Sequence, residues 1–269
     1  MAIATLAAYK TALTAQREIL PITIPSATVT AGRTFDLFDQ MGIAITVPTL
    51  PVVPTNLTAD ALGQQNATGG LQTSILGGYL QGFVGGNYIV CDRLSHQAGL
   101  SAIVTGAQTT NLPTAALTRY TSGEGVMLGI SIYSTVGTTG TTLTATYTNQ
   151  AGVGSRVTPT VAFGATGFRE TSRLFMLPLQ SGDTGVRSVE SVTIAGTTGT
   201  AGNFGVTLFK PLYVLCNDQA NKVISSAGFI SGQSAGGIPK IELDACLFLT
   251  VISEATNAQS NGFLITKEN

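Results

Sequence analysis

The sequence predicts a mainly β protein, an antiparallel β-sandwich or jelly roll with an extended N-terminal arm rich in proline and glycine. Only 10% of its 269 residues are charged and 40 are threonine, so helix-favouring residues are scarce and β-branched residues are abundant. Short apolar segments separated by glycine and threonine recur at intervals of about 10–20 residues, which is typical of sandwiches and jelly rolls. The chain lacks the helical crossovers, about a dozen residues long, that connect parallel strands.

Residues 1–90 are expected to form an arm or a loosely woven lobe. Leu6, Tyr9 and Leu13 have helical spacing and predict a short helix over residues 4–17. Beyond it the chain should be extended, because proline has no N–H for a sheet ladder and pushes the preceding residue toward an extended backbone. The best strand candidates are 29–38 and 43–47. The prolines that support this interpretation are Pro21, Pro25, Pro48, Pro51 and Pro54.

Residues 91–215 are expected to form the sandwich itself. Apolar residues alternate strictly with others over 126–133 and 143–148, which predicts two strands with one face inward. The glycine–threonine linker between them, 137–142, has the length and chemistry of a hairpin turn. A similar linker, 196–203, joins two later strands. Further strands are expected over 157–163, 174–179, 189–194 and 204–209.

Residues 216–269 are expected to complete the sandwich or to form a small second sheet. Residues 223–237 are rich in serine and glycine and indicate a loop. Residues 241–252 are largely apolar, and their core at 246–252 predicts a strand buried on both faces. Asn261 and Gly262 form a turn dipeptide, after which 263–266 should pair back.

No charged side chain occurs from Ala61 to Cys91, a run of 31 residues. Large uncharged apolar surfaces usually mark contact sites. The run is therefore either buried inside the fold or covered by other subunits. Its many glycines favour an irregular segment that lies on another surface.

Composition excludes several classes of protein. With a formal net charge of −1, the chain has little to neutralise phosphates, so no nucleic-acid partner is expected. No apolar run reaches 18 residues and the first 20 residues do not resemble a signal peptide, so no membrane partner is expected. The cysteines Cys91, Cys216 and Cys246 are widely spaced and odd in number, which favours reduced, buried thiols.

Catalysis finds little support in the motifs. His96 is the only histidine, and with Cys91 it would make a nucleophilic pair. A packing role for Cys91 and a hydrogen-bonded loop position for His96 are favoured over catalysis. Residues 232–236 match the G-x-S-x-G elbow of hydrolases, yet Pro239 follows closely and no histidine lies downstream. Asp36, Asp39 and Asp183 are expected to serve turns or face solvent. No catalytic, cofactor or metal site is therefore predicted.

The central stretch carries several motifs that resemble one family. They are Asp92–His96, Leu117–Val126, Tyr147–Gly152, Leu177–Val189 and the segment around Asn203 to Leu208, with fainter echoes in Phe35–Asp39 and Asp244–Leu247. Together these segments, over about residues 90–212, resemble a group of structural proteins of tailed-bacteriophage virions. The resemblance implies a non-enzymatic role in head decoration or capsid cementing.

The function expected from this resemblance is that of a capsid decoration or cement protein, which binds neighbouring capsid subunits and stabilises the head. Its partners would be the major capsid protein or other virion proteins, and copies would associate, a trimer being favoured. It would reside in the virion, assembled in the host cytoplasm. A tail, connector or fibre protein is the alternative, followed by a virion-associated enzyme.

Aromatic and methionine side chains are enriched at protein interfaces, which suggests where a partner would bind. One cluster lies in the arm, and two further aromatic residues lie in the uncharged run. The alternative for the cluster in the arm is that it packs back on the sandwich. The predicted partner-binding residues are Phe35, Leu37, Phe38, Met41, Tyr79 and Phe83.

Overall fold

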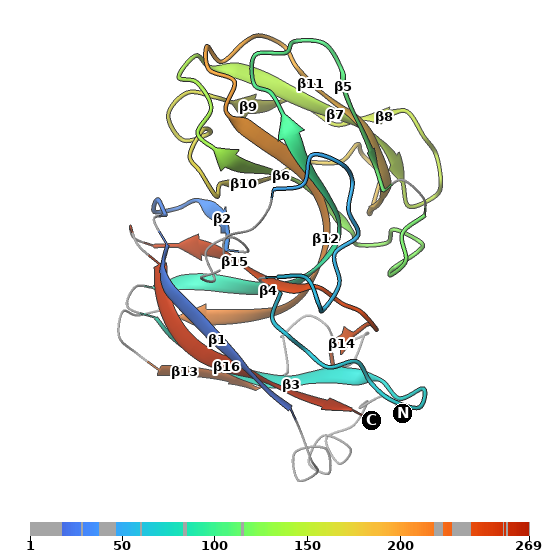
Figure 1. The fold of residues 1–269 in the computed structure, drawn as a ribbon, viewed down its shortest axis with the longest axis vertical. Helices are drawn as coiled ribbons and strands as arrows, with labels where there is room; N and C mark the ends of the chain where they lie inside the picture. Colours follow the sequence, from blue (N-terminus) through green and yellow to red (C-terminus); the bar gives the residue numbers. More distant parts are fainter. Residues whose placement is uncertain are drawn as a thin grey trace. The chain divides into compact units, whose positions relative to one another are not determined.

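The computed structural model describes residues 18–27, 29–37, 47–59, 61–82, 85–113, 116–217, 223–227, 238–254, 256 and 258–268. In these ranges the regular structure is entirely β (Figure 1), and the strands pair antiparallel. The predicted all-β, antiparallel class is thereby confirmed. No helix in the described ranges is long and apolar enough to cross a membrane. The helix predicted over 4–17 and most of the strand predicted over 43–47 lie outside the described residues.

The chain divides into two compact units. Unit 1 takes the described residues of 1–44, 55–92 and 211–269, and unit 2 takes those of 45–54 and 93–210. Two long strands, β4 (Gly86–Leu100) and β12 (Asn203–Asn217), contribute residues to both units. The N-terminal and C-terminal stretches therefore share a unit, whereas the sequence predicted an arm ending at residue 90 and a C-terminal segment starting at 216.

Unit 2 is a β-sandwich with a single apolar core. One layer is the part of the sheet β10-β6-β12-β4-β15-β2 that lies in unit 2. The other layer is the sheet β5-β11-β7-β8, in which β9 also pairs with β7. The core holds alternate residues of both layers, such as Ile130 of β6 and Tyr147 of β7. The strands are β5 (Gln108–Leu112), β6 (Met127–Ser134), β7 (Thr141–Asn149), β8 (Arg156–Val157), β9 (Val161–Phe163), β10 (Leu174–Met176) and β11 (Val186–Ile194).

The two glycine–threonine linkers are crossovers between layers, so the prediction of hairpins was wrong. Strand β6 pairs with β10 and β12, while β7 pairs with β11. The linkers contact each other through the buried Thr198, whose hydroxyl accepts from the Gly137 amide at 3.0 Å. Its carbonyl accepts from the Thr139 amide at 3.1 Å. Turn chemistry specifies a reversal of the chain, but strand pairing depends on distant partners.

Unit 1 is also built from two layers. Sheet A has the order β1-β16-β3-β13, with β14 also pairing β3, and the other layer holds β2 and β15 with parts of β4 and β12. The Tyr88 hydroxyl of β4 lies 2.6 Å from that of Ser260 of β16, which joins the layers. The strands are β1 (Glu18–Ala27), β2 (Thr34–Asp36), β3 (Thr73–Gly82), β13 (Val223–Ala227), β14 (Lys240–Ile241), β15 (Leu247–Ser253) and β16 (Ala258–Glu268).

The described part of the arm is incorporated into unit 1. Strand β1 pairs along its length with β16 and buries Leu20, Ile22 and Ile24. It is an edge strand, which is where a proline such as Pro21 is tolerated. The strand predicted over 29–38 is reduced to β2, which pairs with β15. The expectation of a loosely woven lobe is wrong for these residues, because apolar side chains alternate along β1 and bury one face.

Other parts of unit 1 also differ from expectation. In the uncharged run, residues 73–78 are buried within β3, so this part is internal. Asn261 and Gly262 lie inside β16, where they pair with Gln81 and Leu80 of β3, and no turn forms. Residues 223–227 form β13 where a loop was expected. The strand predicted for the apolar core at 246–252 corresponds to β15, which is buried on both faces except at Ile252.

Candidate interaction surface

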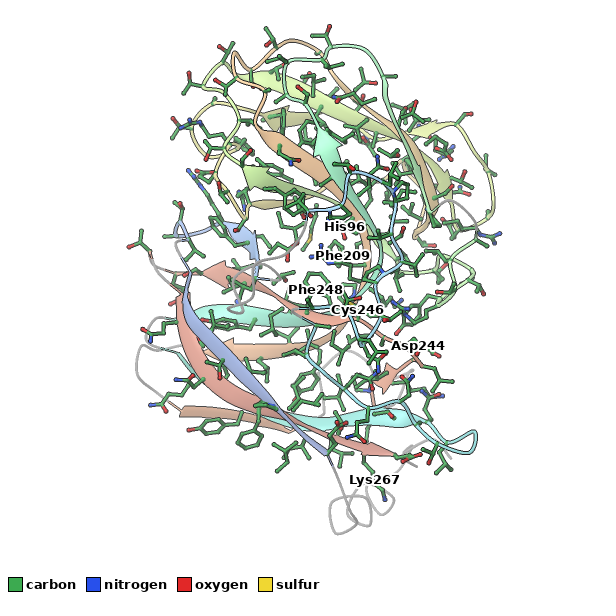
Figure 2. The ribbon with its side chains drawn as sticks, viewed as in Figure 1. His96, Phe209, Asp244, Cys246, Phe248 and Lys267 are labelled. Atoms are coloured by element: carbon green, nitrogen blue, oxygen red, sulfur yellow. The ribbon has the colours of Figure 1, made fainter. Side chains whose placement is uncertain are left out.

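His96 is buried in β4 of unit 2 (Figure 2). Its Nε2 atom lies 2.6 Å from the Tyr133 hydroxyl, and its Nδ1 atom lies 3.4 Å from a guanidinium nitrogen of Arg93. A hydrogen bond to the Val206 backbone completes its surroundings. Burial holds the pKa of His96 well below 6.5, and the positive charge of Arg93 lowers it further. The imidazole is therefore neutral and held by hydrogen bonds.

Cys91 and His96 do not form a nucleophilic pair. They are five residues apart on β4, so their side chains point to opposite faces of the strand. The two residues are also separated by about 16 Å along the strand. The Cys91 thiol instead points to the carbonyl of Ile89, 3.8 Å away. Cys91 and Cys246 are both fully buried. The G-x-S-x-G segment at 232–236 and Asp39 lie outside the described residues.

Lowering the pH from 7 to 5 should destabilise the protein through His96. The pKa of His96 is lower in the folded chain than in the unfolded chain, so the unfolded state takes up more protons below about pH 6.5. The contribution of neutral His96 to the free energy of unfolding is complete above pH 6.5. Below pH 6.5 this contribution falls by about 1.4 kcal/mol per pH unit. Urea unfolding at a series of pH values measures this slope.

The His96→Gln variant is the matched control, since His96 is the only histidine in the chain. It should lower stability at pH 7 and flatten the slope between pH 6.5 and 5. An unchanged slope would show that His96 does not titrate as its burial requires. A hydrolytic activity of the purified protein that disappears in His96→Ala would contradict the expectation that His96 is not catalytic.

Asp183 anchors a turn of unit 2. Its carboxylate accepts hydrogen bonds from the Tyr147 hydroxyl at 2.5 Å and from the Asn149 amide at 2.7 Å. Arg156 adds an ion pair at 3.0 Å. The Tyr147 hydroxyl, with Asn149 and Arg156, lowers the pKa of Asp183. The carboxylate is engaged in tying β7 and β8 to the turn. In the described ranges, no group of three or more His, Cys, Asp or Glu side chains is suited to hold a metal ion.

A cavity of about 620 Å³ lies at one end of sheet A. It is bordered by two carboxylates that bind the loop at 65–68. The amide of Gln65 donates to Glu18 at 3.2 Å, and the Thr68 amide and hydroxyl donate to Glu268. These hydrogen bonds lower the pKa of Glu268. The two acids therefore fasten the loop to the first and last described strands of the chain.

The outer face of sheet A carries a row of exposed and partly exposed side chains, several of them apolar. We define this face by residues on β1, β16 and β3 that alternate with buried ones. Pro21 pairs across the strands with Phe263, and Phe263 with Tyr79. The Tyr79 and Phe263 rings stack with centroids 5.3 Å apart. The face consists of Ile19, Pro21, Thr23, Asn261, Phe263, Ile265, Lys267, Tyr79 and Gln81.

A second apolar surface lies in unit 2 on residues 47–54, which we call the proline strap. The strap is fixed to β4 by a reciprocal backbone pair between Val52 and His96, at 2.9 and 3.0 Å, and by the Ala98 amide. Its side chains Leu50 and Val53 are 73% and 41% exposed. The strap has proline at every third position, 48, 51 and 54, so it offers few amide donors to a further strand. A partner would therefore meet its side chains.

The structure separates the predicted partner-binding residues. Phe35 and Leu37 are fully buried in the interior of unit 1. Tyr79 is partly exposed on the outer face of sheet A. Phe38, Met41 and Phe83 lie outside the described residues.

Sequence reasoning singled out Tyr79 but missed the other residues of both surfaces. Leu50 and Val53 follow prolines at regular spacing, and that regularity was a usable signal for an exposed, extended segment. Ile19 and Phe263 carried no such signal. Alternation identifies two faces of a strand, but when both are apolar only the packing shows which one is left uncovered.

No family model matches the chain, and no curated protein matches it. Among solved structures, the chain is similar to the structure of infectious bursal disease virus, Gt strain. That match has a TM-score of 0.19 and 8% identity, and covers 94% of this chain and 82% of that one. A second is the VP2 subviral particle of the same virus, with a TM-score of 0.19 and 8% identity over 95% and 82%. Scores this low do not establish a shared fold.

Proposed function

We propose that this protein is a structural component of a bacteriophage virion, and specifically a capsid decoration or cement protein without enzymatic activity. Its partners are the major capsid protein or other virion proteins, and its copies associate with one another in the particle. The protein resides in the virion, assembled in the host cytoplasm. The motifs between residues 90 and 212 that resemble tailed-phage structural proteins support this proposal.

The observation that carries the proposal is the proline strap. A chain that works by binding needs apolar side chains that are exposed but held in place. Leu50 and Val53 meet both conditions, because backbone hydrogen bonds fix the strap to β4 while the side chains face outward. A rigid exposed segment loses little conformational entropy on docking. The strap lies in the part of the chain where the sequence predicted the contact with neighbours.

Copy number in purified virions tests the position of the protein. A decoration protein should be present in hundreds of copies, because it binds a repeating shell. A connector, tail or fibre protein should be present in far fewer copies. Quantitative mass spectrometry of particles produced from the genome that encodes this chain makes the distinction. Absence from the particles would contradict the proposed function.

The Leu50→Ser/Val53→Ser variant should reduce occupancy of the particle. If these side chains dock on a neighbour, their loss removes apolar contact at the centre of the interface and should lower the affinity at least about tenfold. Both side chains are exposed, so the fold should be nearly unaffected. Occupancy is measured by mass spectrometry of particles, and folding by thermal denaturation.

Val153→Ser is the matched control, since Val153 is 52% exposed in the same unit. It should leave occupancy unchanged. Normal occupancy of the double variant would show that the strap makes no essential contact, and reduced occupancy in the control would indicate a nonspecific effect of lost surface hydrophobicity.

A further inference from the structure

We propose that Arg119 positions the proline strap for docking, although its own side chain is buried. The inference rests on the proposed function, in which the exposed side chains of the strap contact another virion protein. It adds the residue that holds the strap in the shape that this contact needs. Arg119 is therefore a positioning residue, which acts through the strap and does not itself meet the partner.

The strap is fastened mainly through its carbonyl groups. Proline has no N–H, and the strap has proline at every third position. The strap donates to β4 through the Val52 amide, which bonds the His96 carbonyl at 2.9 Å. Its carbonyls accept hydrogen bonds at Pro48, Thr49, Val52 and Pro54. A segment with so few donors of its own depends on donors from the surrounding structure.

Side chains of β4 supply two of these donors. The Gln97 side-chain amide donates to the Thr49 carbonyl at 3.5 Å, and the Ser95 hydroxyl donates to the Val52 carbonyl at 3.2 Å. Both donors are neutral, and both hold the strap from the same strand. Pro54, at the end of the strap, is held from a different element.

Arg119 supplies the donor for this end of the strap. It lies in the loop between β5 and β6 and is 7% exposed. Its Nη2 atom donates to the Pro54 carbonyl at 3.1 Å and to the Arg93 carbonyl of β4 at 2.8 Å. One nitrogen thus joins the loop, the strap and β4. Hydrogen bonds from a charged donor are stronger than neutral ones, so Arg119 ties its end of the strap more firmly than Ser95 or Gln97 can tie theirs.

The place of this fastening matters for docking. Val53 is 41% exposed and stands between two anchored residues, Val52 bonded to His96 and Pro54 bonded to Arg119. Without Arg119 the chain around Val53 would be held on one side only. The fraction of molecules with the strap in its docking shape would fall, and the apparent affinity would fall in proportion.

Amide hydrogen exchange of the full chain tests the fastening in solution. Arg119→Met removes the donor and keeps an unbranched side chain. Exchange at Val52 should become at least about tenfold faster, which is the factor that one hydrogen bond to a charged group contributes. The Ile130 amide in β6 should keep its protection. Arg169→Met is the matched control, because Arg169 donates to the Val136 carbonyl at 3.1 Å; it should leave exchange at Val52 unchanged.

Binding to particles tests the consequence for docking. Purified protein is titrated onto particles that lack it, and occupancy is measured by mass spectrometry. Arg119→Met should lower the affinity at least about tenfold, and Arg169→Met should not. In the Leu50→Ser/Val53→Ser background, Arg119→Met should add little, because a strap without its apolar side chains gains nothing from being held in place.

Unchanged exchange at Val52 in a folded Arg119→Met chain would overturn the inference. Faster exchange at Val52 and Ile130 alike would also overturn it, since Arg119 would then stabilise the whole unit. Full additivity with the Leu50→Ser/Val53→Ser variant would do the same. If Arg119→Met does not fold, Arg119→Lys decides: it keeps the charge, but its ammonium lies one bond closer to the backbone than Nη2, and it should loosen the strap selectively.

The two proposals fail separately. A wild-type chain that is absent from virions overturns only the proposed function, because the exchange measurements need no partner. A strap that Arg119→Met loosens without any loss of affinity, in a chain whose Leu50→Ser/Val53→Ser variant does lose affinity, overturns only the positioning role of Arg119.

Discussion

Deleting residues 1–40 should leave a chain that cannot fold unit 1. The deletion removes β1 and β2, and with β1 the buried side chains Leu20, Ile22 and Ile24. Loss of one such side chain costs about 2–5 kcal/mol, so three cost about 6–15 kcal/mol. That equals the whole stability of an ordinary domain, roughly 5–15 kcal/mol. Circular dichroism and thermal denaturation should show no cooperative transition for this unit.

Deletion of residues 1–17 is the matched control, because it removes none of the described strands. This shorter chain should unfold cooperatively, as the full chain does. If the chain lacking residues 1–40 proved folded and soluble but failed to join the virion, the N-terminal stretch would be a detachable arm, as the sequence suggested. The burial of β1 argues for the opposite result.

Phe35→Ala should destabilise the protein by about 3–5 kcal/mol. Phe35 is fully buried, and on β2 it pairs with Val251 of β15. Two residues further on, the Leu37 amide donates a hydrogen bond to the Leu249 carbonyl at 3.0 Å. Truncation leaves a cavity that rigid strands cannot close. Equilibrium unfolding in urea measures the loss.

Leu57→Ala provides the comparison, because Leu57 is an almost fully exposed apolar side chain of the same unit. Its effect should stay within about 0.5 kcal/mol. A Phe35→Ala protein of normal stability with lowered occupancy in the particle would restore Phe35 to the role of partner anchor that its residue type first suggested.

The interaction surfaces were only partly predictable. Residue type singled out Phe35, Leu37 and Tyr79 alike, since aromatic and aliphatic side chains serve both cores and interfaces. The structure buries the first two and leaves Tyr79 partly exposed beside Phe263. Exposure depends on which layer covers a strand, and that is a property of the complete fold.

The sequence by itself determined the fold class and much of unit 2. The alternation of Leu143, Ala145 and Tyr147 predicts β7 and its buried face, because side chains of a strand point alternately to its two sides. The apolar core at 246–252 likewise predicts β15. Such features are local, since they depend on residues one or two positions apart.

Only the tertiary structure decided which strands are neighbours. The linkers at 137–142 and 196–203 have the chemistry of hairpins, yet each carries the chain from one layer to the other. Asn261 and Gly262 have the chemistry of a turn, yet they continue β16 because β1 and β3 pair with it on both sides. Two strands far apart in the chain, β1 and β16, become partners because burying Leu20, Ile22 and Ile24 outweighs the local preference for loops. Pairing between distant residues is set by the sum of buried contacts, which no short segment contains.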